Sequence, residues 1–256
     1  MPDIASLFVF PLMLILFRIG SCVMVFPGLS DIAVNTRARM SITFVVSLAM
    51  FAMLEPQMPS LPSANSALIA MVLVEIAIGI MMGISAKLFS SALHVGGEMI
   101  SFTSGLQAAT MFDPSAGGNS TAPSLFLGLI GGVLIFATNL HHFIFMGLIE
   151  SYRVFPVGTL PALGDTAQAV TRIVADMFLI GVKIAAPVVA VGFLGYIALG
   201  IFNRMIPQFQ VFFVALPLTI YVGLYILSIT LAGIVTLYSN EMFEHAILFE
   251  QDLEQK

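Results

Sequence analysis

Long runs of apolar residues, each closed by a short polar or proline-containing break, repeat along the whole chain. An α-helix needs about 20 apolar residues to cross the roughly 30 Å hydrocarbon core of a bilayer. The run at 211–238 is the clearest, because it has no charged residue and is interrupted only by Pro217, whereas the run at 40–54 is short for a complete span. The pattern predicts an all-α integral membrane protein. Its hydrophobic helical segments, about six in number, are expected at residues 4–29, 40–54, 67–86, 124–149, 177–202 and 211–238.

Three polar stretches divide these segments and predict loops. Residues 55–66 contain three prolines, which are unfavourable in helix interiors and in central strands. Residues 112–123 combine proline, a Gly-Gly pair and small polar side chains, and residues 155–165 contain two prolines and two glycines. Compositions of this kind favour turns over regular structure.

Residues 87–111 form a helical pattern with two different faces. One face carries small and polar side chains at helical spacing, and the opposite face is apolar. The residues of the polar face are Ser90, His94, Gly97, Ser101 and Ser104, with Lys87, Ser91 and Glu98 beside them. Polar groups at membrane depth are tolerated where they line a water-filled cavity or are buried against protein. We therefore expect this polar face either to line a wet cavity or to pack closely on a neighbouring helix.

The composition excludes most classes of water-soluble protein. Of the 256 residues, 59% are hydrophobic and 9% are charged, against about 25% charged residues in a typical soluble domain. A soluble globule of this size could not cover so much apolar surface, and disordered proteins, coiled coils and nucleic-acid binders are excluded for the same reason. We expect a single membrane-embedded domain over residues 1–256, without a separate soluble domain. A short acidic C-terminal tail at 241–256 holds five carboxylates.

Three of the predicted spans contain an ionisable residue near the middle, namely Arg18, Glu75 and Lys183. A charge at the bilayer centre costs about 2.5 to 3.5 kcal/mol on insertion scales, so such residues face protein or water. Glu75 could pair with Arg18 or Lys183 in a structural contact, or could lie on a proton pathway. Together with Lys87 and Glu98, these residues are candidates for contacts within an assembly. A small secondary transporter that uses intramembrane Glu75 and Lys183 is the alternative function.

His141 and His142 are the only adjacent histidines in the chain. Neighbouring residues on a helix point about 100° apart, so the two rings do not form the two-ligand arrangement that residues four apart would form. The chain also lacks a nucleotide-binding loop, a dinucleotide fingerprint, a nucleophile elbow and a metalloprotease motif. We therefore expect no catalytic residue, no cofactor and no metal site. A membrane-embedded enzyme that uses these histidines is the weaker alternative.

The most distinctive motif begins at Arg204 and ends at Pro217. A basic turn, a Pro-Gln break, an aromatic-rich re-entry and a second proline predict a helix–break–helix hairpin. The motif resembles the signature of the FliR family of flagellar biosynthesis proteins, which extends to the matching export-gate subunits of virulence-type type III secretion systems. The signature residues in this sequence are Arg204, Pro207, Gln208, Phe209, Phe212 and Pro217.

Other features agree with this resemblance along essentially the whole chain. They are Arg18 followed by Pro27-Gly28, the turn Arg37-Ala38-Arg39, Glu75 with Gly79, and Gly97-Glu98 leading to Gly105-Leu106-Gln107. The resemblance implies a multi-pass core subunit of the flagellar type III export gate, in the bacterial inner membrane at the flagellar basal body. It implies FliP and FliQ as partner subunits, contact with FlhB, and unfolded flagellar proteins as the translocated chains. The fold would then consist of kinked helical hairpins intertwined with the partner subunits.

The resemblance also places a channel plug in the loop that follows Gln107 and runs to about Ala122. A loop with apolar side chains to seal and glycines to bend suits a movable stopper, whereas an ordinary solvent-exposed loop is the alternative interpretation. The plug residues would be Gln107, Met111, Phe112, Asp113, Pro114, Gly117 and Gly118.

Overall fold

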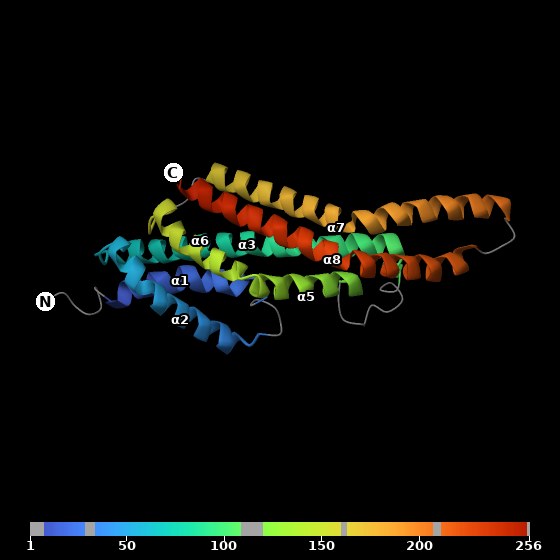
Figure 1. Cartoon of the computed structure of the whole chain (residues 1–256). Helices are drawn as coiled ribbons and strands as arrows, with labels where there is room; N and C mark the ends of the chain where they lie inside the picture. Colours follow the sequence, from blue (N-terminus) through green and yellow to red (C-terminus); the bar gives the residue numbers. More distant parts are fainter. Residues whose placement is uncertain (1–7, 29–33, 109–119, 160–162, 207–210, 255–256) are drawn as a thin grey trace. The chain divides into compact units, whose positions relative to one another are not determined.

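The chain is helical over most of the part that the computed structural model describes, residues 8–28, 34–108, 120–159, 163–206 and 211–254, where no strand occurs (Figure 1). The all-α prediction is confirmed. The helices are α1 (Phe10–Val25), α2 (Thr36–Leu54), α3 (Asn65–Ser104), α5 (Ala122–Ala137), α6 (Leu140–Val154), α7 (Leu163–Met205) and α8 (Val211–Glu254), with a short 3-10 turn, η2 (Glu55–Gln57), after α2.

Two compact units make up the chain, and each is built from segments that lie far apart in the sequence. Unit 1 comprises residues 1–89, 135–174 and 243–256, and unit 2 comprises residues 90–134 and 175–242. Helices α3, α5, α7 and α8 supply residues to both units, whereas α1 and α2 belong to unit 1 alone. Neither unit therefore corresponds to one contiguous stretch of sequence.

Four helices of the described chain are long and apolar enough to cross a membrane, and α5 with α6 makes a fifth if this bent pair counts as one span. The predicted segments correspond to these helices, but their bounds differ, and α7 and α8 extend well beyond the predicted 177–202 and 211–238. Three further differences concern the other segments. The first described segment, α1, has only 16 helical residues. The segment predicted at 67–86 continues without a break, so that α3 has 40 residues. The segment predicted at 124–149 is divided into α5 and α6, which are bent by 70°.

The polar residues in the second half of α3 do not interrupt the helix. Hydroxyl groups of Ser101 and Thr103 donate hydrogen bonds to carbonyls four residues earlier, over 2.8 Å each, so these side chains satisfy themselves within the helix. The helix ends at Ser104, and Gly105 follows with φ at 79°, the left-handed conformation that commonly closes a helix and that glycine adopts without strain.

The helices are interrupted at positions where the sequence has proline or a residue that favours turns. Between α2 and α3, Pro56 lies in the 3-10 turn η2, and the chain then continues without helix to residue 64. Between α5 and α6, Asn139 has φ at 59°, a left-handed conformation that asparagine tolerates better than most residues, and the bend occurs there. Pro187 and Pro217 lie inside α7 and α8 without ending either helix.

The core of unit 1 lies where α1, α2 and α6 meet. Apolar side chains of α1 pack against one face of α2 and against two residues of α6. The fully or almost fully buried members are Ile15, Ile19, Cys22 and Val23 of α1, Met50, Phe51 and Leu54 of α2, and Leu148 and Tyr152 of α6. This apolar packing surrounds the most unusual side chain of the unit, an arginine in the middle of α1.

Candidate functional site

Arg18 on α1 and Glu75 on α3 form an ion pair inside unit 1, and both side chains are 0% exposed. The Arg18 Nε donates to Glu75 Oε2 over 2.6 Å, and Nη2 donates to Oε1 over 3.0 Å, so the contact is bidentate. The guanidinium carbon also lies 3.8 Å from the centre of the Tyr152 ring, in the position of a cation–π contact. Of the two basic residues that the sequence offers to Glu75, the structure places Arg18 beside it.

Further hydrogen bonds satisfy both charges. Arg18 Nη1 donates to Ser151 Oγ over 3.2 Å, and Nη2 donates to the carbonyl of Phe155 over 3.1 Å. The backbone N–H of Gly158 donates to Glu75 Oε1 over 3.4 Å. A buried ion pair offsets its desolvation only when such additional hydrogen bonds are made. The network ties α1, α3, α6 and the turn at 155–158 together, and both oxygens of the Glu75 carboxylate accept hydrogen bonds within it.

Two glycines of α3 allow this close approach to α1. A methyl group at Gly79, one turn after Glu75, would overlap the carbonyl oxygen of Arg18 and the hydroxyl of Ser21. A methyl group at Gly83 would press on the carbonyl of Cys22. Small residues four apart let helices approach until their backbones touch, and here the spacing brings Glu75 within reach of Arg18.

The polar face of α3 packs against the start of α5 in unit 2. The Thr121 N–H donates to Glu98 Oε1 over 3.1 Å, and the hydroxyls of Ser101 and Thr121 lie 2.6 Å apart. Ser124 Oγ donates to the carbonyl of His94 over 3.2 Å. We call these five residues the α3–α5 clasp. The clasp joins the helix that precedes the segment assigned to the plug by the family resemblance to the helix that follows it.

Small residues bring the two helices of the clasp into contact. A methyl group at Gly97 would meet the backbone of Ser124, and one at Gly128 would overlap the imidazole of His94. The face also continues onto α8, since a methyl group at Gly223 would lie 2.5 Å from Cβ of Ser104. The sequence left two expectations for this polar face, a wet cavity or close packing on a neighbouring helix. For these residues the structure confirms close packing.

Lys183 of α7 pairs with Glu241 of α8 inside unit 2, with 2.5 Å between Nζ and Oε1. The two side chains are 42% and 23% exposed, so this pair is accessible where the Arg18–Glu75 pair is not. From the sequence, Glu75 was the predicted partner of Lys183, and Glu241 was placed in the acidic tail. Since 58 residues separate Lys183 from Glu241 in the sequence, no local spacing could have indicated that they meet.

Of the remaining predicted residues, five lie within the described chain and the others lie outside it. Lys87 is exposed on α3, and Gln107 is exposed just after the end of that helix. Arg204 is exposed in the last turn of α7, and Pro217 is exposed within α8, with Phe212 at the start of α8. The residues that lie outside the described chain are Met111, Phe112, Asp113, Pro114, Gly117 and Gly118 of the plug segment and Pro207, Gln208 and Phe209 of the signature hairpin. The plug assignment thus stays a prediction.

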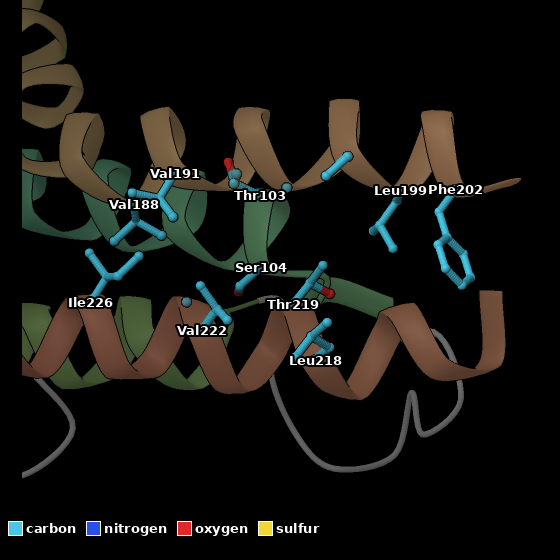
Figure 2. Close-up of a pocket in the computed structure, with 14 residues that line it drawn as sticks. Thr103, Ser104, Val188, Val191, Leu199, Phe202, Leu218, Thr219, Val222 and Ile226 are labelled. Atoms are coloured by element: carbon cyan, nitrogen blue, oxygen red, sulfur yellow. The ribbon is translucent and has the colours of Figure 1, made fainter. Parts of the chain in front are cut away.

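A cavity of about 270 Å³ lies between the end of α3 and the facing halves of α7 and α8 (Figure 2). Figure 2 shows aliphatic and aromatic side chains of α7 pointing toward those of α8, with Thr103 and Ser104 of α3 beside them. Among the described residues, those that line the cavity are uncharged. The amino-acid sequence gave no sign of this cavity, although Gly195 on its wall leaves space, since a Cβ there would meet no heavy atom within 4 Å.

Titratable side chains of the described chain do not converge into a metal site, because no group of three histidine, cysteine, aspartate or glutamate residues lies together there. The rings of His141 and His142 have centroids 4.2 Å apart, and Nδ1 of His141 lies 3.3 Å from the carbonyl of Ile135. His141 also contacts the ring of Phe136. The two histidines therefore take part in the bend between α5 and α6.

Known proteins resemble the chain over most of its length. The family described as "Bacterial export proteins, family 1" matches residues 9–245. A flagellar biosynthetic protein FliR from Caulobacter vibrioides is 34% identical over 236 residues, which cover 92% of this chain and 94% of that protein. The FliR of Aquifex aeolicus is 30% identical over 246 residues, covering 95% and 93%. The FliR of Bacillus subtilis is 28% identical over 235 residues, covering 90% of each chain.

Proposed function

Because the chain belongs to the bacterial export proteins, family 1, we propose that it is a core subunit of the flagellar type III protein export gate in the inner membrane. The match over residues 9–245 carries this proposal, since it includes the buried ion pair, the α3–α5 clasp and the signature hairpin. The partner subunits are FliP and FliQ, with FlhB in contact, and the translocated chains are unfolded flagellar proteins. The subunit shapes and closes a channel and catalyses no reaction of its own.

The lengths of the helices support a role inside a larger assembly. Helices α3, α7 and α8 have 40, 43 and 44 residues. At 1.5 Å per residue each extends about 60 Å along its axis, roughly twice the thickness of the hydrocarbon core. Apolar side chains on the excess length need a cover other than lipid. Partner subunits that wrap around the hairpins provide that cover.

The transporter alternative receives no support from the ionisable residues on which it depends. Glu75 is held by Arg18 and by the N–H of Gly158, and Lys183 is paired with Glu241. Both residues therefore have partners that serve structure, and Glu75 has no exposure to water. A proton-coupled transporter needs a carboxylate that exchanges protons with water during its cycle.

Co-purification from native membranes in mild detergent tests the proposed function. The chain should be recovered in one large complex with two other small hydrophobic proteins, FliP and FliQ, identified by mass spectrometry. A stable monomer or homodimer without these proteins would contradict the proposal. The His142→Ala variant is the matched test of the enzyme alternative, because a gate subunit tolerates that change.

The plug is tested by removing residues 110–120. Without the segment that seals the channel, ion leakage across the inner membrane should rise while the complex still assembles. Leakage is measured as loss of membrane potential, and assembly by co-purification. A control replaces residues 60–64 between α2 and α3, which are exposed except for half-buried Pro62, by a Gly-Ser segment of equal length. Normal leakage in the truncated complex would refute the plug assignment and leave gate membership untouched.

A further inference from the structure

The chain passes Ser101 on α3 and comes back to this residue at Thr121. The hydroxyls of the two residues lie 2.6 Å apart, although 20 positions separate them in the sequence. The N–H of Thr121 also donates to Glu98 Oε1 over 3.1 Å, about one turn earlier on α3. These contacts close residues 102–120 into a loop whose base is only as wide as a hydrogen bond. We call Glu98, Ser101 and Thr121 the neck of this loop.

The last turn of α3, from which the loop departs, is fixed by α7 and α8. The Tyr196 hydroxyl of α7 donates to the carbonyl of Thr103 over 2.9 Å, which satisfies one of the carbonyls that a helix leaves unpaired at its C-terminus. A methyl group at Gly192 of α7 would lie 2.4 Å from the side chain of Thr103, and one at Gly223 of α8 would lie 2.5 Å from that of Ser104. This end of α3 therefore cannot shift without separating from both helices.

The start of α5, to which the loop returns, is fixed on α3. The carbonyl of Thr121 accepts the N–H of Leu125 over 2.9 Å, so Thr121 opens the first turn of α5. A methyl group at Gly97 would lie 2.4 Å from Cα of Ser124, because the backbones of the two helices approach closely there. Packing thus holds both ends of the loop, and the neck joins them directly.

Glu98 is the charged member of the neck. Between Lys87 and Asp113 the sequence has no other Asp, Glu, Lys or Arg, and α5 has none. The carboxylate accepts an N–H at the N-terminal end of α5, where backbone N–H groups lack helical partners and the helix dipole favours a negative charge. Hydrogen bonds to an ionised acceptor are roughly twice as strong as neutral ones. The one charge in this stretch therefore fastens α5 to α3.

We propose that Glu98, Ser101 and Thr121 position the channel plug by holding both ends of the loop that carries it. The inference rests on the plug of the proposed function and adds the residues that hold the plug in place. A chain spans at most about 3.6 Å per residue, so residues 109–119, held at both ends, reach no farther than about 20 Å from those ends. The plug returns to the same place after each exported chain, while α3 and α5 stay in contact.

Variants of Glu98 in the complete complex test the neck. Glu98→Ala removes the acceptor, so ion leakage across the inner membrane should rise about tenfold, which is the shift that one hydrogen bond to a charged group produces. Glu98→Gln keeps an acceptor oxygen and should leak little more than the wild type. Thr103→Val is the matched control, because the Thr103 hydroxyl bonds to the carbonyl of Met99 within α3 and takes no part in the neck.

All three variants should still co-purify with FliP and FliQ, because the neck positions the loop and does not hold the assembly together. Wild-type leakage in the Glu98→Ala complex would overturn the proposal. Equal leakage in the Ala and Gln complexes would also overturn it, since the acceptor oxygen would then have no effect.

A disulfide across the neck tests whether α3 and α5 stay together during export. Ser101→Cys with Thr121→Cys places two thiols where the hydroxyls are 2.6 Å apart, and the only native cysteine, Cys22, is buried in unit 1. After oxidation, thiol alkylation should show that the disulfide has formed. The oxidised complex should export flagellar subunits at the same rate as the same complex after reduction.

Two results of the disulfide experiment would overturn the proposal. A block of export that a reductant relieves would show that α3 and α5 must part. Failure to form the disulfide would show that the neck is open in the assembled gate.

These outcomes can be distinguished from a failure of the proposed function. Co-purification decides membership in the gate, and the removal of residues 110–120 decides whether this segment is the plug. A truncated complex without leakage would refute the plug and the neck together. If the truncated complex leaks and the Glu98→Ala complex does not, the plug stands and the neck alone is refuted.

Discussion

The Arg18–Glu75 pair is buried without any exposure, so it is sensitive to the loss of either partner. Removing one partner by Arg18→Met leaves the carboxylate of Glu75 buried and uncompensated, which costs about 3 to 5 kcal/mol. Removing both, with Arg18→Met and Glu75→Leu, should cost much less than the two single changes together, because no unpaired charge remains. Thermal unfolding of the purified protein in detergent measures the difference.

The control for this prediction is a second Arg–Glu contact in the same unit. Arg153 lies 2.7 Å from Glu150 on α6, but its side chain is 69% exposed. Arg153→Met should therefore change stability by no more than about 0.5 kcal/mol. Equal losses for Arg18→Met and Arg153→Met would contradict the structural role assigned to the buried pair.

A glycine on α3 gives a second test at the scale of single residues. Gly79→Ala improves helix propensity but drives a methyl group into the carbonyl of Arg18. Overpacking of this kind costs about 1 to 3 kcal/mol, which outweighs the propensity gain. Gly200→Ala, with open space around it, should be neutral or slightly stabilising. The melting temperatures of the two variants test this prediction. A higher melting temperature for Gly79→Ala would refute the close approach of α3 to α1.

At the scale of whole elements, the α3–α5 clasp joins two helices through hydroxyl groups that are almost fully buried. Ser101 is 0% exposed and Thr121 is 4% exposed. Ser101→Ala leaves the Thr121 hydroxyl without its partner, which costs about 1 to 3 kcal/mol. Changing both residues, with Ser101→Ala and Thr121→Val, removes donor and acceptor together and should restore most of that loss.

Hydrogen exchange of the α5 amides provides the readout for the clasp. The single variant should increase exchange at the start of α5, and the double variant should return it toward the wild-type rate. Thr171→Val is the control, because Thr171 is exposed and its hydroxyl bonds to the carbonyl of Ala167 within α7. If Ser101→Ala and Thr171→Val behaved alike, the contact between α3 and α5 would not depend on the clasp.

At the level of the whole molecule, the proposed export-gate assembly predicts that the chain depends on its partner subunits for stability in the membrane. Only 22 to 28% of the residues in the apolar windows of α2, α3, α7 and α8 are buried within the chain. Produced without FliP and FliQ, the chain should therefore be degraded, and its amount in the membrane should fall several-fold. Immunoblots of membranes with and without the two subunits measure this fall. Unchanged amounts would contradict the assembly.

The helical class and the polar half of α3 could be predicted because both depend on periodicity within a short stretch. The boundaries of the spans could not. The polar residues of α3 continue the helix, since Ser101 and Thr103 bond to their own backbone, whereas the apolar segment at 124–149 is broken by the left-handed conformation of Asn139. Hydropathy does not register either effect, because it averages over side chains and contains no backbone geometry.

The sequence is sufficient to identify a helical membrane protein, since runs of about 20 apolar residues and helical spacing are local properties. It also marked Arg18, Glu75 and Lys183 as residues that need polar partners, because an isolated charge is costly in hydrocarbon. Which partners these residues have depends on the way the helices pack. Arg18 meets Glu75 over 57 residues of sequence, and Lys183 meets Glu241 over 58. Such contacts depend on how closely distant helices approach, and that distance is set by packing at glycines and not by spacing along the chain.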